Sequence, residues 1–538
     1  DQNNFMIYKN QFFFNISNHF RQFYLNSRFY DKKISKIENK NFIYKPSPHL
    51  LSSLIKYQKK IKIDDFFTSE IWDHKNLSNK DYKNLNSFYW FFSLDLKSSK
   101  KSTQSIITNW INNNSKYNYK SWDYDLTAKR IISWLSCHYL TYEESDNDYK
   151  NSFNEIILKQ TNHLINEIRK SELVDDKLIG CASIILVGLC YSNEKNYLSF
   201  GCSVLKKIAK LALDNYGFPK TRNISQLIFY LKYFILIREW FKESQVNVPE
   251  HVDETIYYLG QGYAFFWKNT GSDLLFNGNN ISKNNDFDNY LRRLGYKFKN
   301  DNQEFGEYII FKNKKICLAM DVGSSPSLDY SRDYQSGALS FEVISNGKKL
   351  ITNCGYYKKK KLNHLSKSSA AQSTLVIDDN SSCKFNKVGD FFLVKNGLKV
   401  IKKNFSFEKN FWKISASHDG YLKKYGSIHE REIEFYPEQM IFKGLDKIIK
   451  KKTNNNYKFD IRFHVEPNIK LMKTQNNKTI LIELNDEGWK FTCNNYDINI
   501  DNGLYFGNKN LYSENQNIYI TGISNNQIEE IKWEIKKI

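Results

Sequence analysis

Residues 339–352 read LSFEVISNGKKLIT, which is the pattern of a β-hairpin. Aromatic, β-branched and other apolar side chains flank the dipeptide Asn346-Gly347. A two-residue turn of type I′ needs positive φ at both central positions, and Asn-Gly meets that need. The same reasoning predicts a second hairpin at Asn396-Gly397, between Phe391–Val394 and Leu398–Val400. We therefore expect short antiparallel strands in this half of the chain.

Further short strands are predicted on both sides of this stretch. They are rich in β-branched and aromatic residues and lie at 308–322, 373–377, 432–436, 459–465, 480–484, 518–521 and 531–535. Many short strands broken by regular turns are typical of a sandwich of two sheets. The pattern predicts an antiparallel β-sandwich over residues 306–538.

The first half of the chain shows helical spacing instead. Apolar residues recur every three or four positions from Phe153 to Ile168, and long apolar runs follow at Leu178–Tyr191, Leu198–Leu213 and Ile224–Phe241. Helices this apolar must be covered on more than one side, as in a ring of helical hairpins. We expect a partly helical extension over residues 1–84, a helical domain over 85–265 and a connecting segment over 266–305.

Composition and charge narrow the classes of function. The 538 residues carry a net charge of +21, which favours a polyanionic partner, although lysines in solvated loops would give the same number. The chain has no RNP-type motif, zinc-finger spacing or basic heptad helix, so we expect no nucleic-acid partner. No stretch reaches 18 apolar residues, so no transmembrane segment is predicted.

The compartment is not fixed by the sequence. The eight cysteines include no C-x-x-C pair and predict no disulfide framework in a chain of this size. No signal-peptide pattern is visible, but the chain starts at Asp1 rather than Met, so a leader and the cytoplasm both stay open.

An ordered series of motifs resembles the heparinase II/III-like family of polysaccharide lyases. In the strand-rich half the series is GALSFEV (337–343), TNCG (352–355), SAAQSTLVIDD (369–379), HDGY (418–421), GSIHER (426–431) and RFH (462–464). The segments 125–134 and 264–278 of the helical half resemble family members as well. The similarity extends from about residue 85 onward.

The resemblance implies an incomplete (α/α) toroid followed by an antiparallel β-sandwich, and β-elimination on a uronate-containing acidic polysaccharide. It also implies a location in the cell envelope or periplasm. The C5 proton of a uronate is weakly acidic, so polar or cationic groups must neutralise the carboxylate and the developing charge. A tyrosine or histidine must remove that proton, and another group must protonate the leaving oxygen.

The chain departs from the active lyases at four positions. It has Asp176-Lys177 where the resemblance implies an Asn-His pair, and Ser225-Gln226 where it implies a tyrosine. Gln372 and Gln335 stand where it implies histidines. Glutamine can hold a carboxylate but cannot exchange a proton at neutral pH. We keep Gln372 as a catalytic-site candidate, and Lys177 and Gln335 as substrate-binding candidates.

Other residues could supply the missing chemistry. We expect Arg222 with Asn223 to hold a carboxylate, or Asn223 to cap a helix. His418 and Tyr421 are the candidate base and acid, unless they are an ordinary pair at a strand end. His429 and Arg431 are candidate substrate-binding residues. His418, His429 and His464 are weak candidates for a structural zinc site, and we expect no other cofactor.

Two hypotheses therefore compete. The first is a lyase with atypical catalytic residues, and the second is a catalytically inactive protein of the same fold that binds or assembles an envelope polysaccharide. The oligomeric state is left open.

Overall fold

The computed structural model describes residues 15–55, 72, 75, 77–93, 100–171, 174–191, 195–282 and 285–538. The predicted N-terminal extension, residues 1–84, lies only partly within these ranges. The chain forms two compact units. The helical unit holds residues up to Leu211 together with Tyr230–Ile256 and Asp286–Gly295, and the strand-rich unit holds Ala212–Phe229, Tyr257–Asn285 and Tyr296–Ile538.

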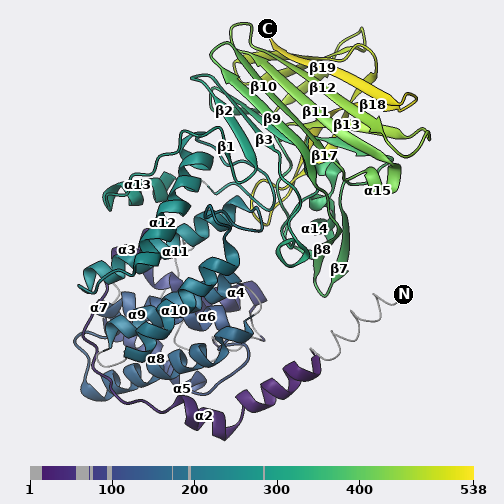
Figure 1. Cartoon of the computed structure of the whole chain (residues 1–538). Coiled ribbons are helices and arrows are strands. Elements are labelled where there is room, and N and C mark those ends of the chain that lie inside the picture. Colours follow the sequence, from purple (N-terminus) through teal and green to yellow (C-terminus); the bar gives the residue numbers. More distant parts are fainter. Residues whose placement is uncertain are drawn as a thin grey trace. The chain divides into compact units, whose positions relative to one another are not determined.

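The helices confirm the predicted helical pattern of the first half (Figure 1). They are α2 (Arg28–Ile34), α3 (Pro48–Ser52), α4 (Asn79–Ser87), α5 (Lys100–Asn114), α6 (Tyr124–Ser136), α7 (His138–Thr141), α8 (Asn147–Glu167), α9 (Val174–Cys190), α10 (Lys195–Ala212), α11 (Ile224–Glu243), α12 (Glu250–Tyr263) and α13 (Asn285–Arg293). Helix α9 is buried over most of its length from Leu178 onward, as the apolar run that begins there predicts. No helix within the described ranges is long and apolar enough to cross a bilayer.

The strand-rich unit contains three larger antiparallel sheets. One has five strands in sequence order, namely β1 (Glu304–Phe305), β2 (Tyr308–Lys312), β3 (Ile316–Asp321), β4 (Phe341–Ser345) and β5 (Lys348–Ile351). A four-stranded sheet has the order β17 (Asp497–Tyr505), β18 (Ser513–Ile523), β13 (Lys458–His464) and β6 (Leu375–Ile377).

The third sheet has eight strands. Its order is β14 (Lys470–Lys473), β15 (Thr479–Leu484), β16 (Glu487–Thr492), β19 (Ile528–Lys537), β12 (Ile441–Lys450), β11 (Ser427–Tyr436), β10 (Phe411–His418) and β9 (Val400–Glu408). Buried and less buried residues alternate along β11 and β12, as expected of strands with one face in a core. A separate hairpin joins β7 (Lys384–Val388) to β8 (Phe391–Asn396), and two short helices, α14 (Lys360–Lys367) and α15 (Leu422–Tyr425), complete the unit.

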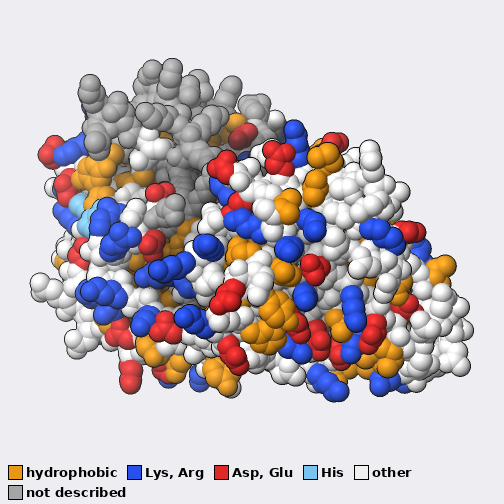
Figure 2. Space-filling view, turned by 90° about the horizontal axis from the view of Figure 1, so that it is seen from above, with side chains coloured by type: hydrophobic (Ala, Val, Ile, Leu, Met, Phe, Trp, Pro, Cys, Tyr) orange, Lys and Arg blue, Asp and Glu red, His pale blue; other side chains and the backbone are white. Residues whose placement is uncertain are grey.

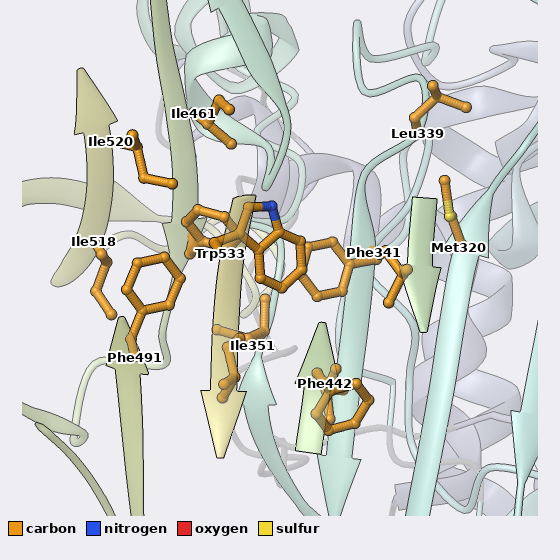
Figure 3. Packing of buried hydrophobic residues seen from close by; sticks show 14 of the residues in the cluster. Met320, Leu339, Phe341, Ile351, Phe442, Ile461, Phe491, Ile518, Ile520 and Trp533 are labelled. Carbon is orange, nitrogen blue, oxygen red and sulfur yellow. The ribbon is translucent and has the colours of Figure 1, made fainter. Parts of the chain in front are cut away.

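One hydrophobic core holds these sheets together. Trp533 of β19 stacks on Phe341 of β4 with ring centroids 5.6 Å apart (Figure 3). The Trp533 ring also lies edge-on to Phe463 of β13, with ring centroids 4.9 Å apart. The eight-stranded sheet therefore forms one layer, and the five- and four-stranded sheets pack against it. This is the predicted antiparallel β-sandwich.

The two hairpin predictions had different outcomes. Asn346 and Gly347 have φ of 46° and 78° and join β4 to β5, so the first prediction is confirmed. The prediction at Asn396-Gly397 is wrong, because β8 pairs with β7 across a turn at Gly389. Leu398 instead accepts a hydrogen bond from the Ser325 N–H through its carbonyl and donates its own N–H to Ser325 Oγ, and this contact directs the chain into β9 of another sheet.

Candidate functional site

A cluster of polar residues in the strand-rich unit gathers around the buried side chain of Gln335. We call the set Asn223, Gly278, Asp333, Gln335, Tyr356, Asn363 and Gln372 the Gln335 cluster. Gln335 Oε1 accepts a hydrogen bond from the Gly278 backbone N–H at 3.0 Å. Its Nε2 donates to the carbonyls of Gly355 at 2.8 Å and Ser366 at 2.6 Å. Every polar atom of this amide is therefore engaged by the backbone.

The Gln372 side chain donates to the same backbone carbonyl as Gln335, that of Ser366. Its Nε2 donates to Ser366 O at 3.0 Å, and its side chain is buried. The two positions where the resemblance implies histidines thus lie side by side, joined through one backbone acceptor. Amides locked in this way position the loops around them, and neither can exchange a proton.

The cluster contains one pair that can exchange a proton, and sequence reasoning missed it. Tyr356 Oη donates to Asp333 Oδ1 at 2.9 Å and accepts from Asn363 Nδ2 at 3.1 Å. Burial and the Asp333 carboxylate raise the pKa of Tyr356, so its phenol stays protonated at neutral pH. The available signal was position: Tyr356 follows Gly355 of the TNCG motif, and Asp333 stands two residues before Gln335.

Close packing brings Asn223 and Asp333 together across Gly278. A Cβ at Gly278 would lie 2.8 Å from both Asn223 Nδ2 and Asp333 Cβ, and the φ of +91° also requires glycine. Asn223 Oδ1 accepts from the Ser225 N–H at 2.9 Å, at the start of α11. Asn223 therefore caps the helix, as one of our two alternatives predicted, while its amide nitrogen faces the cluster.

Arg222 belongs to an ion pair at the edge of the cluster. Its Nη1 donates to Asp321 Oδ1 at 2.8 Å, and its Nη2 donates to the carbonyls of Gly306 and Glu307. Asn277, next to Gly278, donates to the other Asp321 oxygen at 3.0 Å. Both terminal nitrogens of the buried guanidinium are thus occupied by protein acceptors, which favours a role in positioning the loop rather than in holding a substrate carboxylate.

His418, His429 and Arg431 form a different, fully buried network in the sandwich. The Gly420 N–H donates to His418 Nδ1 at 3.0 Å, which assigns the His418 proton to Nε2, 3.2 Å from His429 Nδ1. His429 Nε2 then donates to Asp446 Oδ1 at 2.7 Å. Arg431 Nε donates to the same oxygen at 2.7 Å. Burial lowers the pKa of His418 well below its usual value, so the ring stays neutral.

Tyr421 lies next to this network and is buried as well. Its Oη donates to Leu375 O at 2.8 Å, and burial raises the pKa of the phenol. A side chain without accessible surface cannot reach a bound polymer, so the geometry supports the packing alternative for His418 and Tyr421. The burial of His429 and Arg431 argues in the same way against substrate binding.

The candidate zinc ligands do not fit a metal ion. All four ring nitrogens of His418 and His429 are occupied by hydrogen bonds. His464 lies on β13 and donates its Nε2 to Ala370 O at 2.8 Å. In the parts of the chain that the structure describes, no three His, Cys, Asp or Glu side chains gather as metal ligands.

Lys177 and Asp176 lie in the first turn of α9, in the helical unit. Burial, and then the nearby Asp125 carboxylate, raise the pKa of Asp176 to about 7. A carboxyl group with that pKa can both take and give a proton near neutral pH. Ser225 and Gln226 stand where the resemblance implies a tyrosine. Ser225 Oγ donates to Asn279 Oδ1 and Gln226 Oε1 accepts from Thr221 Oγ1, so both side chains are engaged by hydrogen bonds inside the protein.

Comparisons with known proteins bear on the family and the fold of the chain. The family described as "Heparinase II/III-like, C-terminal" matches residues 303–534. Residues 303–534 are therefore similar to the C-terminal domain of heparinase II/III-like proteins. Five members of the Gln335 cluster lie within the matched residues, namely Asp333, Gln335, Tyr356, Asn363 and Gln372.

Solved structures with the same fold cover nearly the whole chain. Heparinase III matches at a TM-score of 0.69 and 15% identity, over 91% of this chain and 84% of that one. A heparan sulfate lyase HepC mutant from Pedobacter heparinus matches at 0.66 and 12%, over 93% and 84%. At these identities the likeness shows the fold, a helical toroid and a β-sandwich.

A curated sequence relative is the protein Ycf2 of Physcomitrium patens, which is 26% identical over 517 residues. The alignment covers 90% of this chain, but the chain spans only about a fifth of that protein's length.

Proposed function

We propose that the protein is a polysaccharide lyase that acts by β-elimination on a uronate-containing acidic polysaccharide of the cell envelope, with catalytic residues that differ from the family's. The observation that carries this proposal is the Gln335 cluster of the heparinase II/III-like domain. It keeps a proton donor, Tyr356, beside the two positions where the resemblance implies histidines. The net charge of +21 suits an acidic polymer.

The chemistry needs a base for the C5 proton and an acid for the leaving oxygen. Tyr356 can deliver a proton to the leaving oxygen, and Asp333, which accepts the Tyr356 hydrogen bond, can return a proton to the phenolate. Asp333 can take one, and the amide of Asn223 on the other side of Gly278 can bind the uronate carboxylate through hydrogen bonds. In the helical unit, Asp176 is a separate candidate with suitable protonation, since its pKa lies near 7.

The near-ultraviolet absorbance of the C4–C5 double bond conjugated to the carboxylate tests the proposal. Glucuronate-, iduronate- and galacturonate-containing polymers serve as substrates. Tyr356→Phe keeps the ring and removes the proton, so it should lower kcat by about 10²–10⁴-fold. Tyr357→Phe is the matched control, because Tyr357 packs on Phe506 with ring centroids 5.4 Å apart, and it should leave the rate unchanged. Equal rates for the two variants would exclude Tyr356.

Asp176→Asn tests the second group. If Asp176 is the base, the wild-type rate should fall as the pH drops below about 7, because the carboxyl group becomes protonated. The Asn variant should be slow at every pH and lack that acidic limb. An unchanged pH profile would remove Asp176 from the mechanism.

The inactive binding protein is the competing function, and a specific observation favours it. Both glutamines are locked on backbone carbonyls, so the family's histidine chemistry is lost at these positions. Wild-type protein that binds acidic oligosaccharides tightly but forms no chromophore on any polymer would establish this function instead.

A further inference from the structure

Lysine and arginine side chains are scattered among acidic ones on the face seen in Figure 2. Net charge alone therefore does not identify where an anion would bind. A hollow of about 780 Å³ in the strand-rich unit differs from this mixed surface. Its charged lining is Lys384, Lys423, Lys424, Lys452 and Asp419, and we call it the lysine pocket. None of its lining residues belongs to the Gln335 cluster.

The charges of the lysine pocket are not neutralised within the fold. Lys424 Nζ donates to Asn380 Oδ1 at 2.8 Å, and Lys423 Nζ lies 3.4 Å from Asn396 Oδ1. Both acceptors are neutral amides. Among the described residues, no carboxylate lies within 4.0 Å of the ammonium group of any of the four lysines. Four lysines against one aspartate leave the lining at +3.

Two acidic groups near the pocket, Asp419 and Asp379, are engaged by other parts of the fold. Asp419 Oδ1 accepts from the Lys399 N–H at 2.7 Å. Asp378 and Asp379 precede the lining residue Asn380, and Asp379 Oδ1 lies 3.9 Å from Lys458 Nζ. Neither Asp378 nor Asp379 lines the pocket, so an incoming anion meets ammonium groups and the polar backbone.

The floor of the pocket is built by tightly packed backbone. A Cβ at Gly420 would lie 2.7 Å from Ser382 O, so the turn before α15 packs directly on the 380–384 segment. Ser382 is fixed in turn, because its N–H donates to Ser369 Oγ at 3.0 Å and its hydroxyl lies 2.8 Å from Ser336 Oγ. A preformed concave floor lowers the ordering cost of binding, and the volume is typical of small-ligand sites.

We propose that the lysine pocket binds the sulfate or carboxylate groups of an acidic oligosaccharide, as a second contact for the polymer apart from the Gln335 cluster. The inference rests on the proposed function, because it assigns the pocket the same class of polymer. Lysine ammonium groups bind such anions as point charges and impose little geometry. The pocket should therefore recognise charge density more than the identity of the sugar.

Calorimetry at low salt on the full chain tests this. The pocket variant combines Lys384→Gln, Lys423→Gln, Lys424→Gln and Lys452→Gln. The control variant combines Lys314→Gln, Lys315→Gln, Lys409→Gln and Lys470→Gln, which removes the same charge from exposed lysines that do not line the pocket. Probes are a sulfated uronate hexasaccharide, an oligogalacturonate hexasaccharide and a neutral hexasaccharide. Unchanged thermal unfolding establishes that both variants fold.

We expect the pocket variant to bind at least one acidic probe about tenfold more weakly than the control variant does, since four exposed charge contacts are lost. The probe that responds identifies the anionic group, and the neutral probe should not discriminate. Equal binding by the two variants overturns the lysine pocket while leaving the proposed function intact. A wild-type protein that binds no acidic probe overturns the proposed function as well. Pocket-dependent binding of single-stranded DNA that exceeds both glycans overturns the assignment to a polysaccharide.

Discussion

Replacing His464 with glutamine should make the strand-rich unit less sensitive to acid. His464 is buried on β13, and its Nε2 donates to Ala370 O at 2.8 Å. Burial, and then the positive charge of Arg462, lower the pKa of His464 to about 4. Glutamine can keep the donated hydrogen bond and has no charge to gain, so it isolates the effect of titration.

The size of the effect follows from proton linkage. A histidine in the unfolded chain has a pKa of about 6.5, whereas His464 in the folded protein has a pKa of about 4. Between these pH values the unfolded chain binds a proton at this position and the folded protein does not. The stability associated with the neutral ring is fully present above about pH 6.5 and is lost as the pH falls toward 4. At pH 5, about 1.5 pH units below the pKa of the unfolded histidine, the free energy of unfolding is lower by roughly 2 kcal/mol, since each pH unit contributes about 1.4 kcal/mol.

Hydrogen exchange of peptides covering β13, measured under conditions that report global opening, gives the free energy of unfolding at pH 7.5 and 5. Between pH 7.5 and pH 5, the free energy of unfolding of wild type should fall by roughly 2 kcal/mol more than that of His464→Gln. His364→Gln on α14 is the control, because His364 is exposed. If wild type and His464→Gln lose the same stability on acidification, the pKa of folded His464 is not lowered.

Two further substitutions test the packing around the buried networks. Asp446→Ala should lower the free energy of unfolding by about 3–5 kcal/mol, because it leaves the buried Arg431 charge unpaired. The control, Asp486→Ala at an exposed site, should change the free energy of unfolding by no more than about 0.5 kcal/mol. Urea unfolding measures both values. Gly355→Ala should cost more than Gly347→Ala, although their φ angles are 80° and 78°, because only at Gly355 would a Cβ meet another atom, Phe506 C at 2.7 Å. Equal losses in thermal unfolding would show that the Gly355–Phe506 contact yields without cost.

The sequence predicted the fold class because hydrophobic period is a local property. Long apolar runs predicted α9 and α11, and apolar strand-like segments on both sides of Asn346-Gly347 predicted the β4–β5 hairpin. The strand at Ile441–Lys450 was missed, because its buried positions alternate with lysines and include Gly444. That glycine is required by a distant residue: a Cβ there would lie 1.9 Å from the Trp533 ring. Contacts of this kind cannot be read from local pattern.

The site was predicted less well, for the same reason. Motif order identified Gln335 and Gln372, and the structure joins them through Ser366 O. The chemistry of His418 and Tyr421 suggested a site, but their burial depends on how two sheets pack. Tyr356 and Asp333 are 23 positions apart in the chain and become partners only through the fold.

The position of β19 in the eight-stranded sheet has a consequence for biosynthesis. Residues 528–537 lie between β16 and β12, although β12 ends at residue 450. Until the ribosome has made β19, the strands β14–β16 and β9–β12 can exist only as two separate halves, each with an open edge facing the gap. Open strand edges favour intermolecular pairing, and late long-range pairing is slow. A nascent or prematurely terminated chain therefore exposes two unpaired strand edges. A chaperone that covers strand edges would raise the yield of folded protein most during the synthesis of residues 451–537.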